Sequence, residues 1–219
     1  MKVAAFVPIK LNSQRVKNKN IRKLGDKPLL NHVLDNLDQI HSINDIYVYC
    51  SDEVIKTHLS GRAKFLKRNP ALDQDEVIGD QIYRSFISKI EADIYILAHA
   101  TSPFIKPKSI EVALDKVLSS GFDSAHAVTQ QNNFAWFNET PVNFDLDYMP
   151  RTQDIEPVYM ETSAFFIFTK SVWEKHQRRL GTKIYRAVVS NIEGIDIDEE
   201  QDFLLAEAIV KSENRNGNQ

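Results

Sequence analysis

The sequence of 219 residues contains a single cysteine, Cys50, and only seven glycines. One cysteine excludes a disulfide within the chain and a zinc site built from cysteines. No apolar run approaches the roughly 20 residues that a membrane-spanning helix needs, and no signal peptide is recognisable. The Gly-x-x-x-x-Gly-Lys loop of P-loop NTPases and the Gly-x-Gly-x-x-Gly turn of dinucleotide enzymes are also missing. We therefore expect a soluble, cytoplasmic protein of neither class, with no membrane partner.

The overall charge and length set further limits. The formal net charge is -3, and 42% of the residues are apolar. Such a chain lacks the basic face that general nucleic-acid binding requires. The length suits one substantial hydrophobic core, so we predict a single domain over residues 1–211. The polar stretch 212–219 is predicted to be disordered.

Strands and helices are predicted to alternate along this domain. Apolar runs predict strands at residues 3–9, 45–50, 64–67, 93–98, 124–129, 164–168 and 186–190. Helical spacing and start signals predict helices at residues 28–37, 78–90, 107–118, 170–178 and 199–211, the second with Asp75 as its cap. This alternation predicts an α/β fold with three layers and a mostly parallel, doubly wound central sheet.

The loop after the first strand carries cations without an intervening acid. Lysine, arginine and small polar side chains are interleaved there, namely Lys10, Asn12, Ser13, Gln14, Arg15, Lys17, Asn18, Lys19 and Asn20. Open α/β sheets bind ligands at the carboxyl ends of their strands, so mutually repelling cations at this point indicate a bound polyanion. The loop contains no glycine, so its side chains would hold a phosphate more than its backbone. The alternative is a solvated basic loop.

Two acidic residues near the C-terminus alternate with isoleucines. In an extended segment, this spacing puts Asp196 and Asp198 on one face and Ile195 and Ile197 on the other. Neighbouring carboxylates repel unless a cation joins them, and Mg²⁺ accepts one or two carboxylates plus substrate phosphates. Asp198 also suits the N-cap of the last helix, so both interpretations stand. Together with the basic loop, the pair indicates a nucleoside triphosphate site.

Residues 130–157 interrupt the alternation of strands and helices. They contain aromatic residues without helical spacing, namely Phe134, Trp136, Phe137, Phe144 and Tyr148. A long irregular insert in a compact domain is usually functional or an assembly element, and exposed aromatics are costly. We predict a dimerisation arm or a substrate lid. The alternative is a local cluster that covers one end of the sheet.

The motifs, taken in order, resemble one family. Residues 8–21 resemble the opening motif of the acylneuraminate cytidylyltransferases, the CMP-sialic acid synthetases and their relatives. Further similar segments span almost the whole chain: residues 25–30, Ser51-Asp52, Arg68 with Leu72 and Asp75, Thr101-Ser102-Pro103, and 195–198 with Asp202. The resemblance implies a Rossmann-like nucleotidyltransferase fold. It also implies a homodimeric, Mg²⁺-dependent enzyme that joins CTP to a nonulosonic, sialic-acid-like sugar acid and releases pyrophosphate.

The resemblance also suggests a role for each candidate residue. Lys10, Arg15 and Lys19 would be catalytic, because they would neutralise the triphosphate and the charge that develops on it. Those three cations would bind nucleotide together with Asn12, Ser13, Arg68 and Asp75. The sugar would be bound by His99, Thr101, Ser102, Arg151, Tyr159 and Phe166, and the metal by Asp196 and Asp198.

Two of these assignments have alternatives. Arg151 suits a sugar carboxylate, but it is also close in sequence to Asp145, Asp147 and Asp154 and can pair with one of them. His99 suits a catalytic base or a hydrogen-bonded structural residue.

The sequence departs from the family pattern at several positions. Lys10 and Lys17 replace arginine and proline, His99-Ala100 replaces glutamine-proline, Ile105 replaces arginine, and Thr162-Ser163 replaces asparagine-glycine. The sugar is therefore not defined by the resemblance. Two other functions stay open: a non-catalytic protein that binds a nucleotide or nucleotide-sugar, and a nucleotidyltransferase that acts on a sugar 1-phosphate. The first would not need paired acids, and the second would need further cations on the sugar side.

Overall fold

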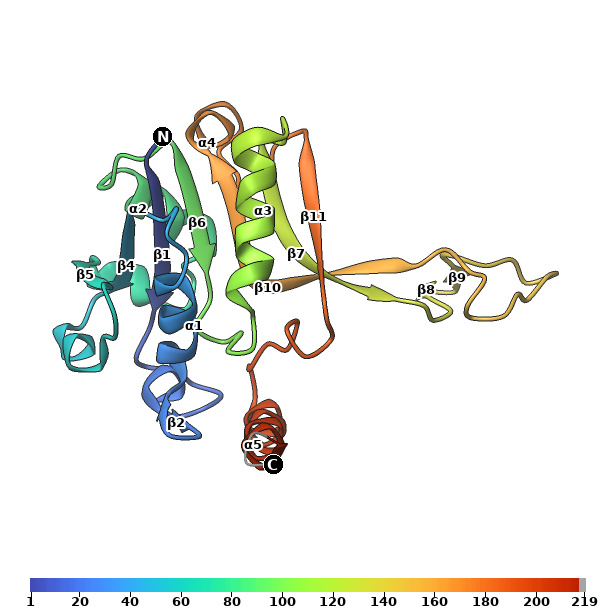
Figure 1. Ribbon diagram of the computed structural model, residues 1–219, viewed down its shortest axis with the longest axis horizontal. Helices are drawn as coiled ribbons and strands as arrows, with labels where there is room; N and C mark the ends of the chain where they lie inside the picture. The colour runs from blue at the N-terminus through green and yellow to red at the C-terminus, as the bar shows by residue number, and fades with distance from the viewer. Residues whose placement is uncertain (217–219) are drawn as a thin grey trace.

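A mixed sheet forms the centre of the molecule (Figure 1). The computed structural model describes residues 1–216. Within them, the main sheet has seven strands in the order β11-β7-β10-β6-β1-β4-β5. Their bounds are β1 Val3–Ile9, β4 Asp45–Cys50, β5 Lys64–Lys67, β6 Ile94–Ala98, β7 Ser124–Gln131, β10 Val158–Thr169 and β11 Ile184–Val189. Only β10 runs antiparallel to its neighbours β6 and β7, so the prediction of a mostly parallel sheet is confirmed.

Helices cover both faces of this sheet. They are α1 Leu29–Asp38 and α3 Pro107–Ser119 on one face, and α2 Gly79–Ile87 and α4 Lys170–His176 on the other. Successive residues of a strand point to opposite faces, so Val7 of β1 packs toward α1 and α3, while Phe6 packs toward α2 and α4. The ring of Phe6 stacks on that of Phe86, with centroids 4.1 Å apart. The predicted three layers are confirmed.

The last helix, α5 Glu200–Asn216, packs below the sheet against the loop that follows β1 (Figure 1). Phe203 and Ile197 share a buried apolar cluster with Val16. The guanidinium carbon of Arg22 lies 3.8 Å from the ring centre of Phe203. Short elements complete this region and the rim: β2 Lys23–Leu24, β3 Lys27–Pro28, and the 3₁₀ turns Lys19–Ile21, Glu53–His58 and Pro70–Asp73. The last helix thus packs against the N-terminal part of the chain.

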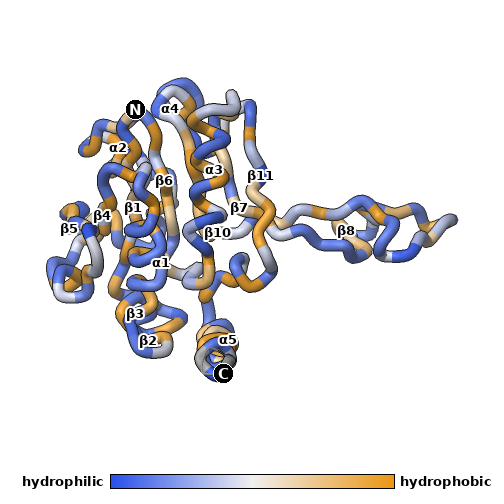
Figure 2. The backbone as a smooth tube through the Cα atoms, viewed as in Figure 1, coloured by the Kyte–Doolittle hydropathy of each residue, from blue (hydrophilic) through white to orange (hydrophobic). Residues whose placement is uncertain are grey.

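The segment between β7 and β10 projects from the body as an arm (Figure 1). Both strands run on past the sheet, and the short strands β8 Trp136–Phe137 and β9 Thr140–Pro141 pair near the tip. Hydrophilic and hydrophobic stretches alternate along it (Figure 2). Several large apolar side chains are exposed, namely Trp136, Phe137, Val142, Leu146, Tyr148 and Met149. The arm therefore does not cover one end of the sheet, so that alternative is wrong.

Several predicted boundaries were wrong. The strand predicted at 164–168 begins at Val158, because its first half belongs to the arm. The helix that Asp75 was expected to cap begins at Gly79, with Ile78 at the N-cap position. Helix α5 continues past Lys211, so residues 212–216 of the predicted disordered stretch are helical, and 217–219 lie outside the described residues. None of the described helices is long and apolar enough to cross a membrane.

Candidate functional site

The loops after β1 and β6 meet at one edge of the sheet. Lys10 follows β1 and His99 follows β6, and these strands are parallel neighbours. The chain runs from β1 to β4 on one side and returns to β6 on the other, so a crevice opens between them, where α/β sheets bind ligands. Two adjoining pockets, of about 670 and 280 Å³, share Lys10, Gln74 and Asp75. Their size suits a small-molecule ligand such as a nucleotide.

The first cation of the loop is held by Asp75. Lys10 Nζ donates to Asp75 Oδ1 over 2.8 Å, and Gln14 Nε2 donates to Asp75 Oδ2 over 2.6 Å. The hydrogen bond from Lys10, followed by that from Gln14, lowers the pKa of Asp75. Asp75 therefore fixes the basic loop instead of capping a helix. Gln14 was not among the predicted site residues.

The other two predicted cations converge on Asp198. Arg15 Nη2 lies 3.0 Å and Lys19 Nζ 3.2 Å from Asp198 Oδ1. Lys19 also donates to the carbonyl oxygen of Ile197 over 2.6 Å, and the residue is only 9% exposed. The basic loop is thus held by ion pairs, although Arg15 and Lys17 remain exposed to solvent. These contacts bring together residues about 180 positions apart in the sequence.

The acidic segment has the two faces that its alternation predicted. Ile197 is fully buried in the apolar cluster and Ile195 packs against that cluster. The amide of Ile197 donates to the carbonyl of Thr101 over 2.8 Å, which anchors the segment beside the end of β6. On the other face, Oδ1 of Asp196 is buried and accepts no hydrogen bond from any described residue.

The start of helix α5 is satisfied by Asp202. Its Oδ2 accepts hydrogen bonds from the amides of Asp198 and Glu199, over 2.9 and 2.8 Å. The carboxylate of Asp198 instead faces Arg15 and Lys19. The geometry therefore favours a site role for Asp198 over a capping role.

A divalent cation fits this acidic pair. Asp196 offers a buried, unpartnered carboxylate oxygen, and the Asp198 side chain is 45% exposed two residues away. Carboxylate oxygens are hard ligands of the kind Mg²⁺ prefers. Within residues 1–216, no group of three or more His, Cys, Asp or Glu side chains could hold a metal alone. The residues present thus fit Mg²⁺ that is held jointly with substrate phosphates.

Arg68 is a buried residue that ties two strand ends together. Only 1% exposed, it donates through Nη2 to the carbonyl of Ile9 over 2.7 Å and through Nη1 to that of Tyr49 over 3.2 Å. Its Nε donates to Asp73 over 3.1 Å. The guanidinium is committed to the protein, although the side chain lines the smaller pocket. Arg68 therefore shapes the smaller pocket, and its contact with a nucleotide stays a prediction.

The remaining loop residues lie near the larger pocket or within the protein. Asn12 is exposed and lines the larger pocket, and Ser13 is half-buried. Ser102 is fully buried and its hydroxyl has no partner among the described residues, so its contact with a sugar stays a prediction. Thr101 contributes the carbonyl that anchors Ile197.

His99 lies between the acidic pair, Asp196 and Asp198, and the predicted sugar side. Burial lowers the pKa of His99, and this effect is partly opposed by the hydrogen bond to the carbonyl of Ser163 and by the charge of Asp196. Its ring meets that of Phe166 edge to face, with centroids 6.3 Å apart. A neutral imidazole therefore stands between the acidic pair and the predicted sugar side.

Two arginines that the sequence did not reveal lie on the predicted sugar side. The guanidinium carbon of Arg179 is 4.0 Å from the ring centre of Phe166, and that of Arg186 is 4.5 Å from the ring centre of Tyr159. Neither forms an ion pair with any residue that the structure describes. The alternation of side chains along β11 was only a weak sequence signal for the position of Arg186. Arg179 follows the end of α4, and nothing local predicts its contact with β10.

Comparison with known proteins decides the family. Residues 4–215 match the profile of the cytidylyltransferases. The chain belongs to the cytidylyltransferase family. N-acylneuraminate cytidylyltransferase A of Danio rerio is 27% identical over 218 residues, which are 95% of this chain and 50% of that protein. Pseudaminic acid cytidylyltransferase of Campylobacter jejuni is 24% identical over 226 residues, which are 96% of this chain and 97% of that protein.

The family's fold is recognisable in solved structures. CMP:2-keto-3-deoxy-manno-octonic acid synthetase complexed with CTP superposes with a TM-score of 0.71 at 14% identity, over 97% of this chain and all of that one. At this identity the likeness shows the fold alone, and the predicted nucleotidyltransferase fold is confirmed. The chain spans about half the length of the first curated relatives that it matches.

The predicted arginine for a sugar carboxylate, Arg151, lies away from the other candidate residues in this member of the family. It lies on the projecting arm, 76% exposed, and Nε donates to Asp154 Oδ2 over 2.7 Å. This is one of the local ion pairs considered for it. Within one chain, Arg151 is therefore not gathered with Tyr159 and Phe166.

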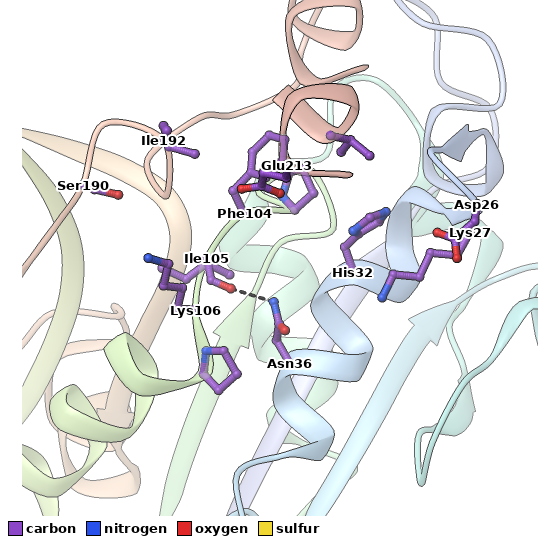
Figure 3. Close-up of a pocket in the computed structure, with 13 residues that line it drawn as sticks. Asp26, Lys27, His32, Asn36, Phe104, Ile105, Lys106, Ser190, Ile192 and Glu213 are labelled. Atoms are coloured by element: carbon purple, nitrogen blue, oxygen red, sulfur yellow. Dashed lines mark hydrogen bonds between the residues drawn. The ribbon is translucent and has the colours of Figure 1, made fainter. Parts of the chain in front are cut away.

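A separate groove of about 570 Å³ lies between α1, the loop after β6 and α5 (Figure 3). His32 and Asn36 line it from α1, and Asn36 Nδ2 donates to the carbonyl of Ile105 over 2.6 Å. Phe104 and Glu213 face it from the other sides (Figure 3). None of the predicted site residues lines this groove, so it is distinct from the crevice beside β1 and β6.

Proposed function

We propose that this cytidylyltransferase-family protein transfers the CMP group of CTP to a nonulosonic sugar acid and releases pyrophosphate. The observation that carries the proposal is the meeting of two cations of the basic loop, Arg15 and Lys19, with Asp198, while the third, Lys10, lines the crevice beside Asp75. Family membership supports CTP as the nucleotide. The names of relatives that act on acylneuraminate and pseudaminic acid support an acidic sugar.

In the proposed reaction, the anomeric hydroxyl oxygen of the sugar attacks the α-phosphorus of CTP. An oxygen–phosphorus bond forms, and the bond between the α-phosphorus and the bridging oxygen breaks, so pyrophosphate leaves with the electron pair. The hydroxyl proton passes to a base. His99 suits this role because it is neutral, and its Nδ1 bonds the Ser163 carbonyl while Nε2 stays available to accept a proton.

The cations of the basic loop would stabilise the charge on the phosphates. Lys19 is buried, so its attraction for a phosphate oxygen is screened less than that of an exposed lysine. Arg15 adds a planar fork that matches two phosphate oxygens. Asp196 and Asp198 would hold Mg²⁺, which when bound would neutralise further phosphate charge. Lys10 would complete the set by exchanging Asp75 for the triphosphate.

We also propose that the protein works as a homodimer joined through its arm. The exposed Trp136, Phe137 and Tyr148 support this, because such side chains on an extended arm are costly in water. A second copy related by a twofold axis would cover them. In that assembly Arg151 would be available to a neighbouring site. A cytoplasmic location stays a prediction.

One observation favours a second candidate, transfer of a nucleotidyl group to a sugar 1-phosphate. That substrate would need additional cations on the sugar side, and Arg179 and Arg186 supply them. A non-catalytic binder of nucleotide is the third candidate. It would leave the buried oxygen of Asp196 without a role.

A pyrophosphate-release screen separates the three candidates. CTP, ATP, GTP and UTP would each be offered with a panel of nonulosonic acids and sugar 1-phosphates, with Mg²⁺ or with EDTA. We expect release only with CTP, a nonulosonic acid and Mg²⁺. Release with sugar 1-phosphates alone would favour the second candidate. CTP binding without release under any condition would favour the third.

A matched pair of lysine variants tests the basic loop. Lys19→Ala should weaken CTP binding or turnover by about tenfold or more, because a charge-assisted hydrogen bond contributes ~1.5–3 kcal/mol. Lys17→Ala is the control, because Lys17 is exposed and contacts no acid in the described chain within ion-pair distance. Equal CTP affinity and rate in the two variants would remove Lys19 from the site.

A further inference from the structure

Arg179 lies on two aromatic rings at the side of the crevice. Its guanidinium carbon is 4.0 Å from the ring centre of Phe166 in β10 and 5.4 Å from that of Tyr83 in α2. Tyr83 lines the smaller pocket together with Lys10 and His99. Arg179 therefore stands beside the pocket that holds the predicted catalytic lysine and the imidazole.

The guanidinium has no anionic partner in the described chain. The residue is half-buried, yet no carboxylate lies within ion-pair distance of it. The two rings stabilise the cation through its face and leave its charge without a counterion. The N–H groups along its edge remain as donors in a planar fork, which matches a carboxylate with two parallel hydrogen bonds. This arrangement is suited to an anion from outside the chain.

The position of His99 relates this guanidinium to the acidic pair. The imidazole meets the ring of Phe166 edge to face, with centroids 6.3 Å apart, and the guanidinium carbon of Arg179 lies 4.0 Å from the centre of the same ring. His99 and Arg179 are therefore neighbours on one aromatic ring. A substrate seated at His99 would meet the nucleotide phosphates on one side and Arg179 on the other.

The chemistry of a nonulosonic acid fits this spacing. In such sugars the carboxylate and the anomeric hydroxyl are attached to the same carbon. A site that directs the hydroxyl toward a phosphate must therefore also hold a carboxylate close by. A sugar 1-phosphate carries a phosphate on that carbon instead, and its larger charge would call for more than one close cation.

We propose that Arg179 binds the carboxylate of the acidic sugar and so selects the substrate, a role that Arg151 was predicted to fill. The proposal rests on the proposed function. Gly79 supports the arrangement, because a Cβ at this position would lie 2.6 Å from the hydroxyl oxygen of Tyr83. The glycine leaves room for the ring on which Arg179 lies.

Steady-state kinetics of three variants test the assignment. Arg179→Gln should lower kcat/KM for the nonulosonic acid by ten- to a hundredfold and leave KM for CTP within about twofold. Arg179→Lys keeps the charge without the fork and should fall between that variant and the wild type. Arg178→Gln is the matched control, because the neighbouring Arg178 is exposed and donates only to the carbonyl of Gly181 in the described chain.

A substrate analogue isolates the carboxylate. The wild type should be much slower with the sugar whose carboxylate is replaced by a carboxamide. With that analogue, Arg179→Gln should lower kcat/KM only slightly further. The assignment would be overturned if Arg179→Gln lowered kcat/KM by the same factor for the acid and for the carboxamide. It would also be overturned if Arg179→Gln left kcat/KM for the acid unchanged. Should Arg179→Gln not fold, Arg179→Lys carries the same comparison.

The two proposals fail in different ways. If the wild type is inactive with every nonulosonic acid, or active only with sugar 1-phosphates, the proposed function fails and this inference falls with it. If the wild type is active and Arg179→Gln matches Arg178→Gln, only the assignment of Arg179 fails.

Discussion

Asp196→Asn and Asp198→Asn should change stability in opposite directions, although the two residues are only two positions apart. Asp198 accepts from Arg15 and from Lys19, whose side chain is only 11% exposed. Asp196 has a buried oxygen with no partner in the described chain. Asp198→Asn removes ion pairs, whereas Asp196→Asn removes a charge that has no partner in the described chain.

The size of each effect follows from exposure. The Arg15–Asp198 pair is largely exposed and contributes about 0.2–1 kcal/mol. The Lys19 pair is worth about 1 kcal/mol after allowance for the half-exposed carboxylate. Asp198→Asn should therefore lower the free energy of unfolding by about 1–2 kcal/mol. Asp196→Asn should raise it by about 1 kcal/mol, because it removes the charge of a half-buried carboxylate whose inner oxygen accepts no hydrogen bond in the described chain.

Thermal unfolding in EDTA at low ionic strength measures this difference. A change of 1 kcal/mol shifts Tm by about 2–4 °C in a chain of this size, so the two variants should move to opposite sides of the wild type. Glu199→Gln is the control, an exposed acid next to the pair. With Mg²⁺ and CTP, both Asp variants should lose most of the ligand-induced rise in Tm and of the turnover.

Two results would refute this reasoning. Equal destabilisation of both variants in EDTA would show that Asp196 makes contacts that stabilise the fold. Normal Mg²⁺-dependent turnover in both would show that the pair holds no catalytic metal.

Three further predictions concern other parts of the structure. A Cβ on Gly194 would lie 2.4 Å from Cγ2 of Thr129, so Gly194→Ala should displace the acidic segment and reduce turnover, and Thr129→Ser, which removes that methyl, should restore part of it. Burial lowers the pKa of His99 below 6.5, so the unfolded chain binds more protons there and stability falls as pH drops below 6.5. His99→Gln should flatten that fall in urea unfolding between pH 7 and 5. Trp136→Ser with Phe137→Ser should convert the proposed dimer to a monomer in sedimentation, and a wild type that is already monomeric at micromolar concentration would defeat the arm interface.

The parts of the fold that were predicted correctly are those with a strong local pattern. The strand at residues 3–9 is a continuous apolar run and is buried on both faces. The stripe that includes Leu30, Val33 and Leu37 is fully buried on the sheet, as its spacing indicated. The alternation of Asp196 and Asp198 with isoleucines likewise fixed which side chains face the site. In each case a single segment contains the whole signal.

The parts that were missed depend on contacts between distant segments. The strand from Val158 extends beyond the sheet only because β7 pairs with it along the arm. Asp75 looked like a helix cap, but its partners lie more than 60 positions earlier in the chain. Arg179 carries no local mark of its packing on Phe166. Sequence spacing within one element does not contain such pairings.

Asp75 and Asp198 give the basic loop internal counterions. They hold Lys10, Arg15 and Lys19 through the same oxygen chemistry that phosphates offer, so the cations stay in position when no nucleotide is present. In the proposed reaction, substrate entry and pyrophosphate exit would be exchanges of one anion for another, and the buried Lys19 would keep a counterion between cycles. Such an exchange would lower the net affinity for triphosphate but would return the loop to the same geometry each time. The binding of CTP should consequently depend less on ionic strength than binding to an open basic surface would.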